Sequence, residues 1–352
     1  MNKKRYSNIE LLRIISMVMV LSLHSFTWNR ALGSDGYLHD FSWRVFFDYY
    51  RESLCVCAVN VYILISGYWG INWKLKSFLN FIFQVYFWSL GVYFVLLVSG
   101  KIEFSYCTLF SRFNCLISDW WFVEAYIGLY LLSPILNSFI EKCNRKALFA
   151  WVLLFFFFEI YSEILSSDRY FHRGYNTLSF CGIYILGRLL KLYKDILQKI
   201  QRKTISSIFL ISYLFIGLVI SSLAIYQLIY RGHEYMVIQK SFTFSYTNPL
   251  VITEAVCLFL VFSSMSFRNK IVNSVAGSIF AVYLLHMHPN LKEWYYSYCG
   301  HLYDKPIIYH ILILICLFVG IIIVSVSMDK MRLQLFQWLF TKYELKYKNN
   351  GI

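Results

Sequence analysis

Residues 306–327 read PIIYHILILICLFVGIIIVSVS, the most informative stretch of the chain for its fold class. It contains no Asp, Glu, Lys or Arg. A helix of about 20 apolar residues is long enough to cross the hydrocarbon core of a bilayer. The stretch therefore predicts a transmembrane helix.

The same criterion selects nine further stretches, so we predict an all-α, polytopic membrane helix bundle. It would form a single integral membrane domain over residues 1–352. Two stretches fit least well, because the second begins with charged residues and the ninth is short. The predicted spans are 9–28, 45–69, 78–99, 120–140, 147–165, 177–193, 205–230, 248–266, 272–288 and 306–327.

The composition agrees with lipid as the main solvent. Hydrophobic residues make up 59% of the chain and charged residues 15%, whereas soluble domains carry about 25% charged residues. The net charge of +14 could suggest nucleic acid, but the basic residues are spread over short loops and form no stripe. We therefore expect membrane lipid and no nucleic acid as partner. No metal site is expected, because no CxxC or His-rich spacing occurs.

The distribution of Lys and Arg predicts the orientation. Cytoplasmic loops of membrane proteins are enriched in these residues, and an inner N-terminus places most of the 33 basic residues inside. We predict a multi-pass protein of the inner (plasma) membrane with both termini cytoplasmic. Tryptophans at the proposed outer boundaries fit an aromatic belt: Trp28, Trp43, Trp120, Trp121 and Trp294.

The first span carries ionisable residues, which are costly in a bilayer and usually mark a function or a paired contact. At 100° per residue, Glu10, Arg13 and His24 share one helix face. Arg13 lies near the cytoplasmic end, and His24 follows about 16 Å further out. The alternative is a structural Glu10–Arg13 pair with an interfacial histidine. Glu10 and Arg13 also interrupt the apolar run, so it does not fit a cleaved signal peptide.

Other ionisable residues near the spans favour a structural role when each is taken alone. Several lie in the predicted outer half, which suggests a polar cavity there. They are Asp48, Arg51, Glu52, Glu124, Glu159, Glu254, His286 and His288.

Four segments follow one another along the chain. The first is Asn8-Ile-Glu-Leu-Leu-Arg13 followed by His24, and the second is Val61-Tyr-Ile-Leu-Ile-Ser66-Gly67-Tyr68. The third is Trp120-Trp-Phe-Val-Glu124-Ala-Tyr126, running on to Leu131-Leu-Ser-Pro134, and the fourth is Ala281-Val-Tyr283-Leu-Leu-His286. In this order they resemble the acyltransferase family 3 membrane proteins, and the resemblance covers nearly the whole chain.

The resemblance implies transfer of an acyl group, most often acetyl, from a cytoplasmic acyl-CoA-type donor to a glycan hydroxyl. The glycan would be at the cell surface or linked to lipid. No bound cofactor is implied, because acetyl-CoA or a similar donor is a substrate. His24 would act as the base or as the acyl carrier, since a histidine with an ordinary pKa can do either near neutral pH.

The remaining roles follow the same resemblance. Arg13 would attract donor phosphate, and Glu10 would orient the Arg13 side chain. Trp121 and Glu124 would line the acceptor side. Many members carry an arginine-rich stretch at the start of the third span, but here only Lys74 and Lys76 could hold donor phosphates.

A transporter or polymerase of polysaccharides or lipid-linked oligosaccharides is the alternative function. Such proteins are also polytopic and aromatic-rich. A transporter favours helices broken by Gly or Pro at the midplane, and the chain contains only 4 Pro.

The charge asymmetry generates a first testable prediction. Single cysteines placed at Asn2 and at Asn350 are expected to react with a membrane-impermeant thiol reagent only after the membrane is opened. A cysteine in a predicted outer loop, such as Cys107, serves as the positive control. Labelling of either terminus in intact cells would contradict the ten-span topology.

Overall fold

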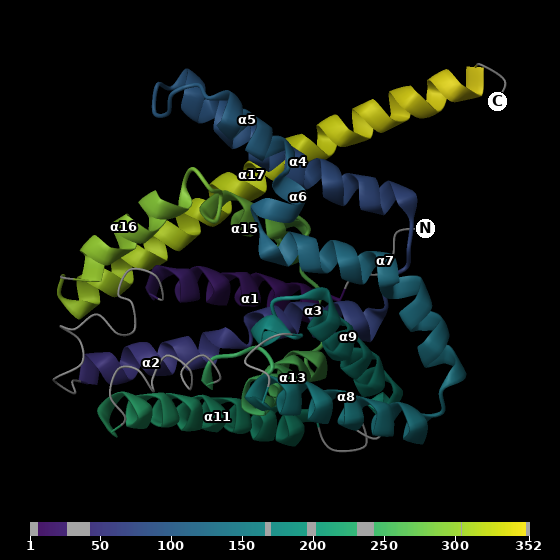
Figure 1. Ribbon diagram of the computed structural model, residues 1–352, viewed down its shortest axis with the longest axis vertical. Coiled ribbons are helices and arrows are strands. Elements are labelled where there is room, and N and C mark those ends of the chain that lie inside the picture. The colour runs from purple at the N-terminus through teal and green to yellow at the C-terminus, as the bar shows by residue number, and fades with distance from the viewer. Residues whose placement is uncertain are drawn as a thin grey trace. The chain divides into compact units, whose positions relative to one another are not determined.

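The computed structural model describes residues 6–26, 43–165, 170–195, 202–230, 243–303 and 305–349. These residues form helices and contain no strand, which confirms the all-α fold class (Figure 1). Trp28 and most of the predicted loops 29–44 and 231–247 lie outside the described residues.

The contacts divide the chain into two compact units. The first comprises Met1–Trp73 and Trp121–Asn273, and the second comprises Lys74–Trp120 and Ser274–Ile352. Each unit is formed by segments that are distant in sequence. The single domain over residues 1–352 stays a prediction.

The first unit is built around α3. This helix contacts α1, α9 and α13, while α11 packs on α2 and α13, and α9 also contacts α7 and α8. The bounds are α1 Ser7–Phe26, α2 Trp43–Val56, α3 Ala58–Trp69, α7 Trp121–Lys142, α8 Arg145–Leu165, the 3₁₀ turn η1 His172–Gly174, α9 Thr177–Leu192, α11 Arg202–Tyr230 and α13 Pro249–Ser264.

Two glycines allow α3 and α9 to pack backbone against backbone. A Cβ atom added at Gly67 would collide with the backbone carbonyl of Tyr184. A Cβ atom added at Gly187 would come within 2.6 Å of the Leu64 carbonyl oxygen. Small residues are enriched where membrane helices approach closely, because lipid provides little hydrophobic force to drive helices together. Gly67, quoted above as part of a motif, is therefore a packing residue of the first unit.

Capping residues fix where α9 and α13 begin. The Asn176 side chain accepts a hydrogen bond from the Ser179 amide at 2.9 Å, and Asn248 accepts one from the Leu250 amide at 2.9 Å. Asparagine is a favoured N-cap, and Pro249 occupies the first turn of α13, where its missing N–H is not needed.

The second unit centres on α4, α15 and α17, which contact one another. Its helices are α4 Leu75–Val98, α5 Tyr106–Phe113, α6 Cys115–Ser118, α15 Phe280–His286, α16 Lys292–Tyr303 and α17 Ile307–Asn349. Helix α14, Lys270–Ala276, lies across the boundary in sequence between the two units.

A buried ion pair within α17 is hydrogen-bonded to side chains of α4. Asp329 and Arg332 are 0% and 2% exposed, and their closest charged atoms are 2.9 Å apart. The Gln84 amide donates to Asp329 at 2.8 Å, and Arg332 donates to the Asn80 side chain. A buried charge is tolerated when its partners satisfy it, so the pair sets the register of α17 against α4.

The apolar helices confirm a multi-pass membrane protein. Within the described residues, six helical runs are long and apolar enough to cross a membrane, and the total of ten spans stays a prediction. The six runs are Ser7–Ser25, Trp43–Trp69, Leu75–Val98, Trp121–Lys142, Ser206–Gln227 and Ile307–Phe340. Helices α8, α9 and α13 follow the predicted fifth, sixth and eighth spans.

Three features differ from the predicted spans. The ninth span, 272–288, is not one helix, because turns at 277–279 separate α14 from α15. The tenth helix continues to Asn349, well beyond residue 327. The predicted loops 100–119 and 289–305 contain α5, α6 and α16. A search for apolar stretches does not detect a short break in a helix, and it does not detect a helix that continues beyond its apolar residues.

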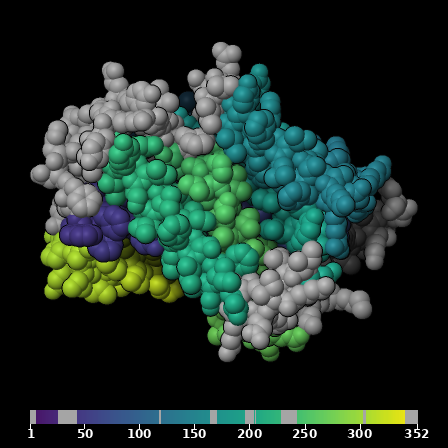
Figure 2. All heavy atoms as spheres, turned by 90° about the horizontal axis from the view of Figure 1, so that it is seen from below, coloured from purple at the N-terminus to yellow at the C-terminus, as the bar shows by residue number. Residues whose placement is uncertain are grey.

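The surface of α11 is apolar, as expected for a helix that faces lipid. Figure 2 shows α11, in green, at the surface of the first unit. Its side chains Ile208, Ile211 and Phe215 are more than half exposed. In water this surface would be an exposed hydrophobic patch, whereas lipid tails solvate it without cost.

The glycine contact generates a stability prediction. Gly67→Ala is expected to lower the free energy of unfolding by about 1–3 kcal/mol, because the added methyl group forces α3 away from α9. Gly91→Ala in α4 is the matched control, since among the described residues no atom beyond its own stretch of helix lies within 4 Å of its added Cβ. Thermal unfolding of both variants in detergent measures the difference. Equal unfolding temperatures would contradict the packing role of Gly67.

Candidate functional site

Helix α1 is continuous from Ser7 to Phe26 and carries Glu10, Arg13 and His24, as the sequence predicts. Polar contacts fix its first turn to the end of α13 and the following segment. Ser7 donates to the Asn273 side chain at 2.9 Å, and Asn8 donates to the Phe262 carbonyl at 2.8 Å. These contacts set both the depth and the rotation of α1 in the first unit.

Glu10 and Arg13 form the predicted ion pair. One terminal nitrogen of Arg13, Nη1, donates to both carboxylate oxygens of Glu10 at 3.1 Å. The Glu10 side chain is 9% exposed and that of Arg13 is 34% exposed. Within the described residues, Nη2 and Nε of Arg13 make no hydrogen bond. Arginine has five N–H donors, so the pair leaves Arg13 able to bind an anion.

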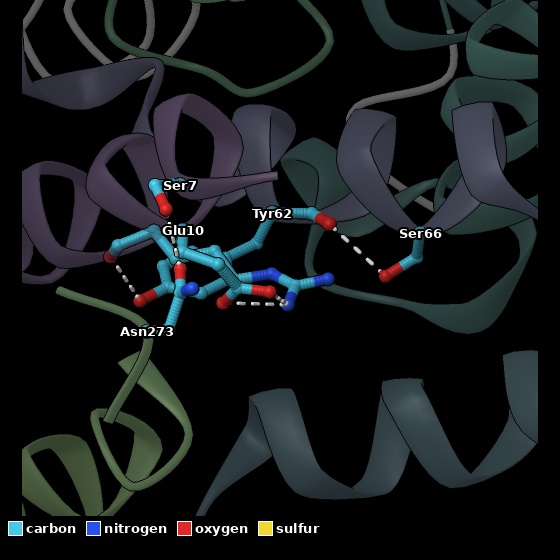
Figure 3. Close-up of polar contacts among 6 residues, drawn as sticks. Ser7, Glu10, Tyr62, Ser66 and Asn273 are labelled. Carbon is cyan, nitrogen blue, oxygen red and sulfur yellow. Dashed lines mark hydrogen bonds and ion pairs between the residues drawn. The ribbon is translucent and has the colours of Figure 1, made fainter. Parts of the chain in front are cut away.

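Helix α3 supports the Arg13 segment from the side. The Tyr62 hydroxyl donates to the Arg13 carbonyl at 2.7 Å. Ser66 donates to the Tyr62 carbonyl at 3.1 Å, and its hydroxyl lies 3.4 Å from that of Tyr126. Figure 3 shows the Ser7–Asn273 and Tyr62–Ser66 contacts on either side of Glu10. Ser66, another residue of the quoted motifs, therefore links α3 to α7.

His24 lies near the other end of α1 and is half-buried. Eleven residues separate it from Arg13, which corresponds to about 16 Å along a helix. The site thus offers a cation near one end of α1 and an imidazole near the other. That arrangement suits a reaction whose two substrates approach from opposite ends.

Two residues of the third quoted segment, Trp121 and Glu124, have different surroundings. The Trp121 ring lies 4.4 Å from that of Tyr175 and 5.8 Å from that of Tyr246, measured between centroids. Glu124, one helical turn further along α7, is exposed. No sequence pattern distinguishes Tyr175 or Tyr246, since the chain contains 29 Tyr.

The remaining predicted residues of the site belong to the second unit. Lys74 and Lys76 are exposed at the start of α4, and the Lys76 ammonium lies 4.3 Å from the centre of the Phe340 ring. Tyr283 and His286 are buried in α15, where the His286 ring packs against that of Tyr295 at 5.4 Å. The fourth motif is therefore part of the packing between α15 and α16.

The other ionisable residues are mostly buried. Glu159 and Glu254 in the first unit are 1% and 0% exposed, and Glu52 is 5% exposed. Arg51 pairs with Asp48 at 3.5 Å. His288, in the second unit, lies 3.1 Å from the Ser89 carbonyl.

An all-helical chain with several membrane-length helices, and with a cation and a histidine on its first helix, has the features of a polytopic membrane enzyme. A model of the acyltransferase family 3, described as an acyltransferase domain, matches residues 6–330. The chain belongs to this family. It is a membrane acyltransferase that transfers groups other than aminoacyl groups. No curated protein and no solved structure matches the chain significantly.

The geometry of Arg13 generates a prediction about the charge and shape of its side chain. Arg13→Ala should lower acyl transfer about 10- to 100-fold, as expected for loss of hydrogen bonds to a charged group. Arg13→Lys should keep part of the activity, because it keeps the charge but loses the planar fork.

Arg145→Ala is the control, since this exposed arginine pairs with Asp195 only at 4.0 Å. Initial rates are measured at equal membrane abundance and unfolding temperature. Full activity of Arg13→Ala would show that the Glu10–Arg13 pair is structural only.

Proposed function

We propose that this acyltransferase moves an acyl group, most often acetyl, from a cytoplasmic acyl-CoA-type donor to a hydroxyl of a cell-surface or lipid-linked glycan. The observation that carries the proposal is the arrangement on α1. Arg13 keeps unused donors near one end of the helix, and His24 lies near the other. The protein acts in the inner (plasma) membrane with both termini in the cytoplasm.

On the donor side, Arg13 binds donor phosphate while Glu10 holds its guanidinium in place. Arginine suits this role because its fork matches phosphate oxygens and is always charged. Lys74 and Lys76, both exposed, are further candidates for binding donor phosphate. The donor is a substrate, and the reaction needs no bound cofactor.

His24 removes the proton from the glycan hydroxyl. The hydroxyl oxygen then attacks the thioester carbonyl, the C–S bond breaks, and the ester C–O bond forms. The thiolate released takes up a proton, so atoms and charge balance. Alternatively, the His24 imidazole first attacks the thioester carbonyl, and the C–S bond breaks with loss of the thiolate. The glycan hydroxyl then takes the acyl group, the N–C bond breaks, and the hydroxyl proton passes to the imidazole. Trp121 and Glu124 contribute to the acceptor side.

Membership of an acyltransferase family favours this function over the transporter or polymerase alternative. Neither of those functions requires transfer of an acyl group. An aromatic ring at the acceptor side is consistent with a sugar, because aromatic faces pack against the C–H face of pyranose rings.

His24→Gln is expected to abolish most glycan acylation. Gln keeps polarity and approximate volume but cannot act as a base near neutral pH, and loss of a general base costs about 10²–10⁴ in rate. Mass spectrometry of surface glycan from cells with wild-type protein, without it and with His24→Gln measures the acetyl-sized mass difference.

His301→Gln, which changes an exposed histidine of α16, is the matched control. Membrane abundance and unfolding temperature are measured in parallel, so that loss of folding is not mistaken for loss of chemistry. A normally abundant His24→Gln protein that acylates at the wild-type rate would overturn the role of His24. Identical glycan masses with and without the wild-type protein would overturn the glycan as acceptor.

A further inference from the structure

Three aromatic side chains gather in the first unit. The rings of Trp121, Tyr175 and Tyr246 lie 4.4, 4.9 and 5.8 Å apart, centroid to centroid. Trp121 is the first residue of α7, Tyr175 precedes the cap of α9, and Tyr246 precedes the cap of α13. The cluster, which we call the aromatic platform, therefore forms where three helices begin.

Hydrogen bonds hold the backbone of Tyr246 from several directions. Its amide donates to the Arg173 carbonyl at 3.2 Å, and its carbonyl accepts from the Asn60 side chain at 2.9 Å. Its neighbours Ser245 and Thr247 donate to the two carboxylate oxygens of Glu163 at 3.0 and 2.7 Å. Tyr246 is consequently fixed by α3, α8 and the turn before α9.

The turn before Tyr175 has an unusual backbone. His172, Arg173 and Gly174 all have positive φ, at 44°, 56° and 87°. Two of these residues are not glycine, and such conformations cost energy and persist only where the surroundings enforce them. A Cβ atom at Gly174 would come within 2.5 Å of the Tyr246 Cβ, so this glycine lets the turn approach Tyr246 closely.

The platform is accessible. Tyr175 is 45% exposed, and Trp121 and Tyr246 are half-buried. An aromatic belt also contains exposed Trp and Tyr, but an anchor in lipid does not require a strained turn or a hydrogen-bonded carboxylate behind it. Rings held in fixed positions lose little freedom when a ligand binds, and this favours a binding site.

We propose that Trp121, Tyr175 and Tyr246 form a stacking subsite for a pyranose ring of the glycan acceptor. This inference deepens the proposed function and rests on it for the identity of the acceptor. Tyr175 presents the most exposed ring to the sugar, while Trp121 and Tyr246 hold it from behind. Glu163 and Asn60 act as positioning residues, because they hold Tyr246 and do not belong to the platform.

Substitutions of Tyr175 test the subsite in the full-length protein. The probe is the surface glycan of cells that produce this protein, stripped of esters by mild alkali. Tyr175→Ala should weaken glycan binding and raise the acceptor KM about three- to tenfold, the usual size of an aromatic contact. Tyr175→Phe should stay within about twofold of wild type, because the ring remains. The donor KM should not change in either variant.

Tyr170→Ala is the matched control. Tyr170 lies five residues before Tyr175, is 63% exposed and makes no ring contact with the described residues. Binding to immobilised glycan and acyl transfer are measured separately, at equal unfolding temperature. If the wild-type protein binds the glycan through Tyr175 but transfers nothing to it, the subsite stands and the proposed function fails.

Three outcomes would overturn the subsite. The first is a wild-type protein that does not bind the glycan. The second is Tyr175→Ala with the affinity and acceptor KM of Tyr170→Ala. The third is a rise in donor KM alone, which would place Tyr175 on the donor side.

Discussion

The first unit depends on the backbone contact between α3 and α9 at Gly67 and Gly187. Lipid supplies little force to drive helices together, so close packing of backbones becomes decisive. Once this contact fixes α3, the same helix positions both the Tyr246 backbone and the Arg13 segment of α1. Asn60 holds the Tyr246 backbone and lies six residues, or about 1.7 turns of helix, before Ser66, which is next to Gly67. Between them, Tyr62 supports the Arg13 segment of α1.

Two arginines in the membrane helices, Arg332 and Arg13, differ in how many of their side-chain nitrogens are bonded within the protein. All three side-chain nitrogens of Arg332 are engaged by Asp329 and Asn80, and the residue is buried. Such a pair holds helices in register, and each nitrogen of its arginine is already bonded within the protein. Arg13 uses only Nη1 for Glu10 and stays one-third exposed. The same residue type is a structural clamp in α17 and a ligand-binding candidate in α1.

The spans could be predicted largely from sequence because lipid requires long apolar helices whose backbone groups bond internally. The predicted ninth span, 272–288, contains two helices, a break that the sequence does not reveal because the segment is equally apolar whether its helix is continuous or broken at 277–279. The length of α17 was missed because Asp329 and Arg332 end the apolar run, yet their partners on α4 satisfy the buried charges and the helix continues. Both differences depend on contacts between helices, and the residue pattern of a single helix carries no information about such contacts.

The helical membrane fold, the family resemblance and the placement of Glu10, Arg13 and His24 on one helix follow from the amino-acid sequence alone. These depend on spacing within single segments, where helix geometry relates neighbours directly. The contacts of Trp121 with Tyr175 and Tyr246, and the contacts that Gly67 and Ser66 make between helices, become visible only in the folded chain. The three rings come from separate segments, and nothing local distinguishes two tyrosines among 29. Helix packing and the left-handed turn at 172–174 bring them together.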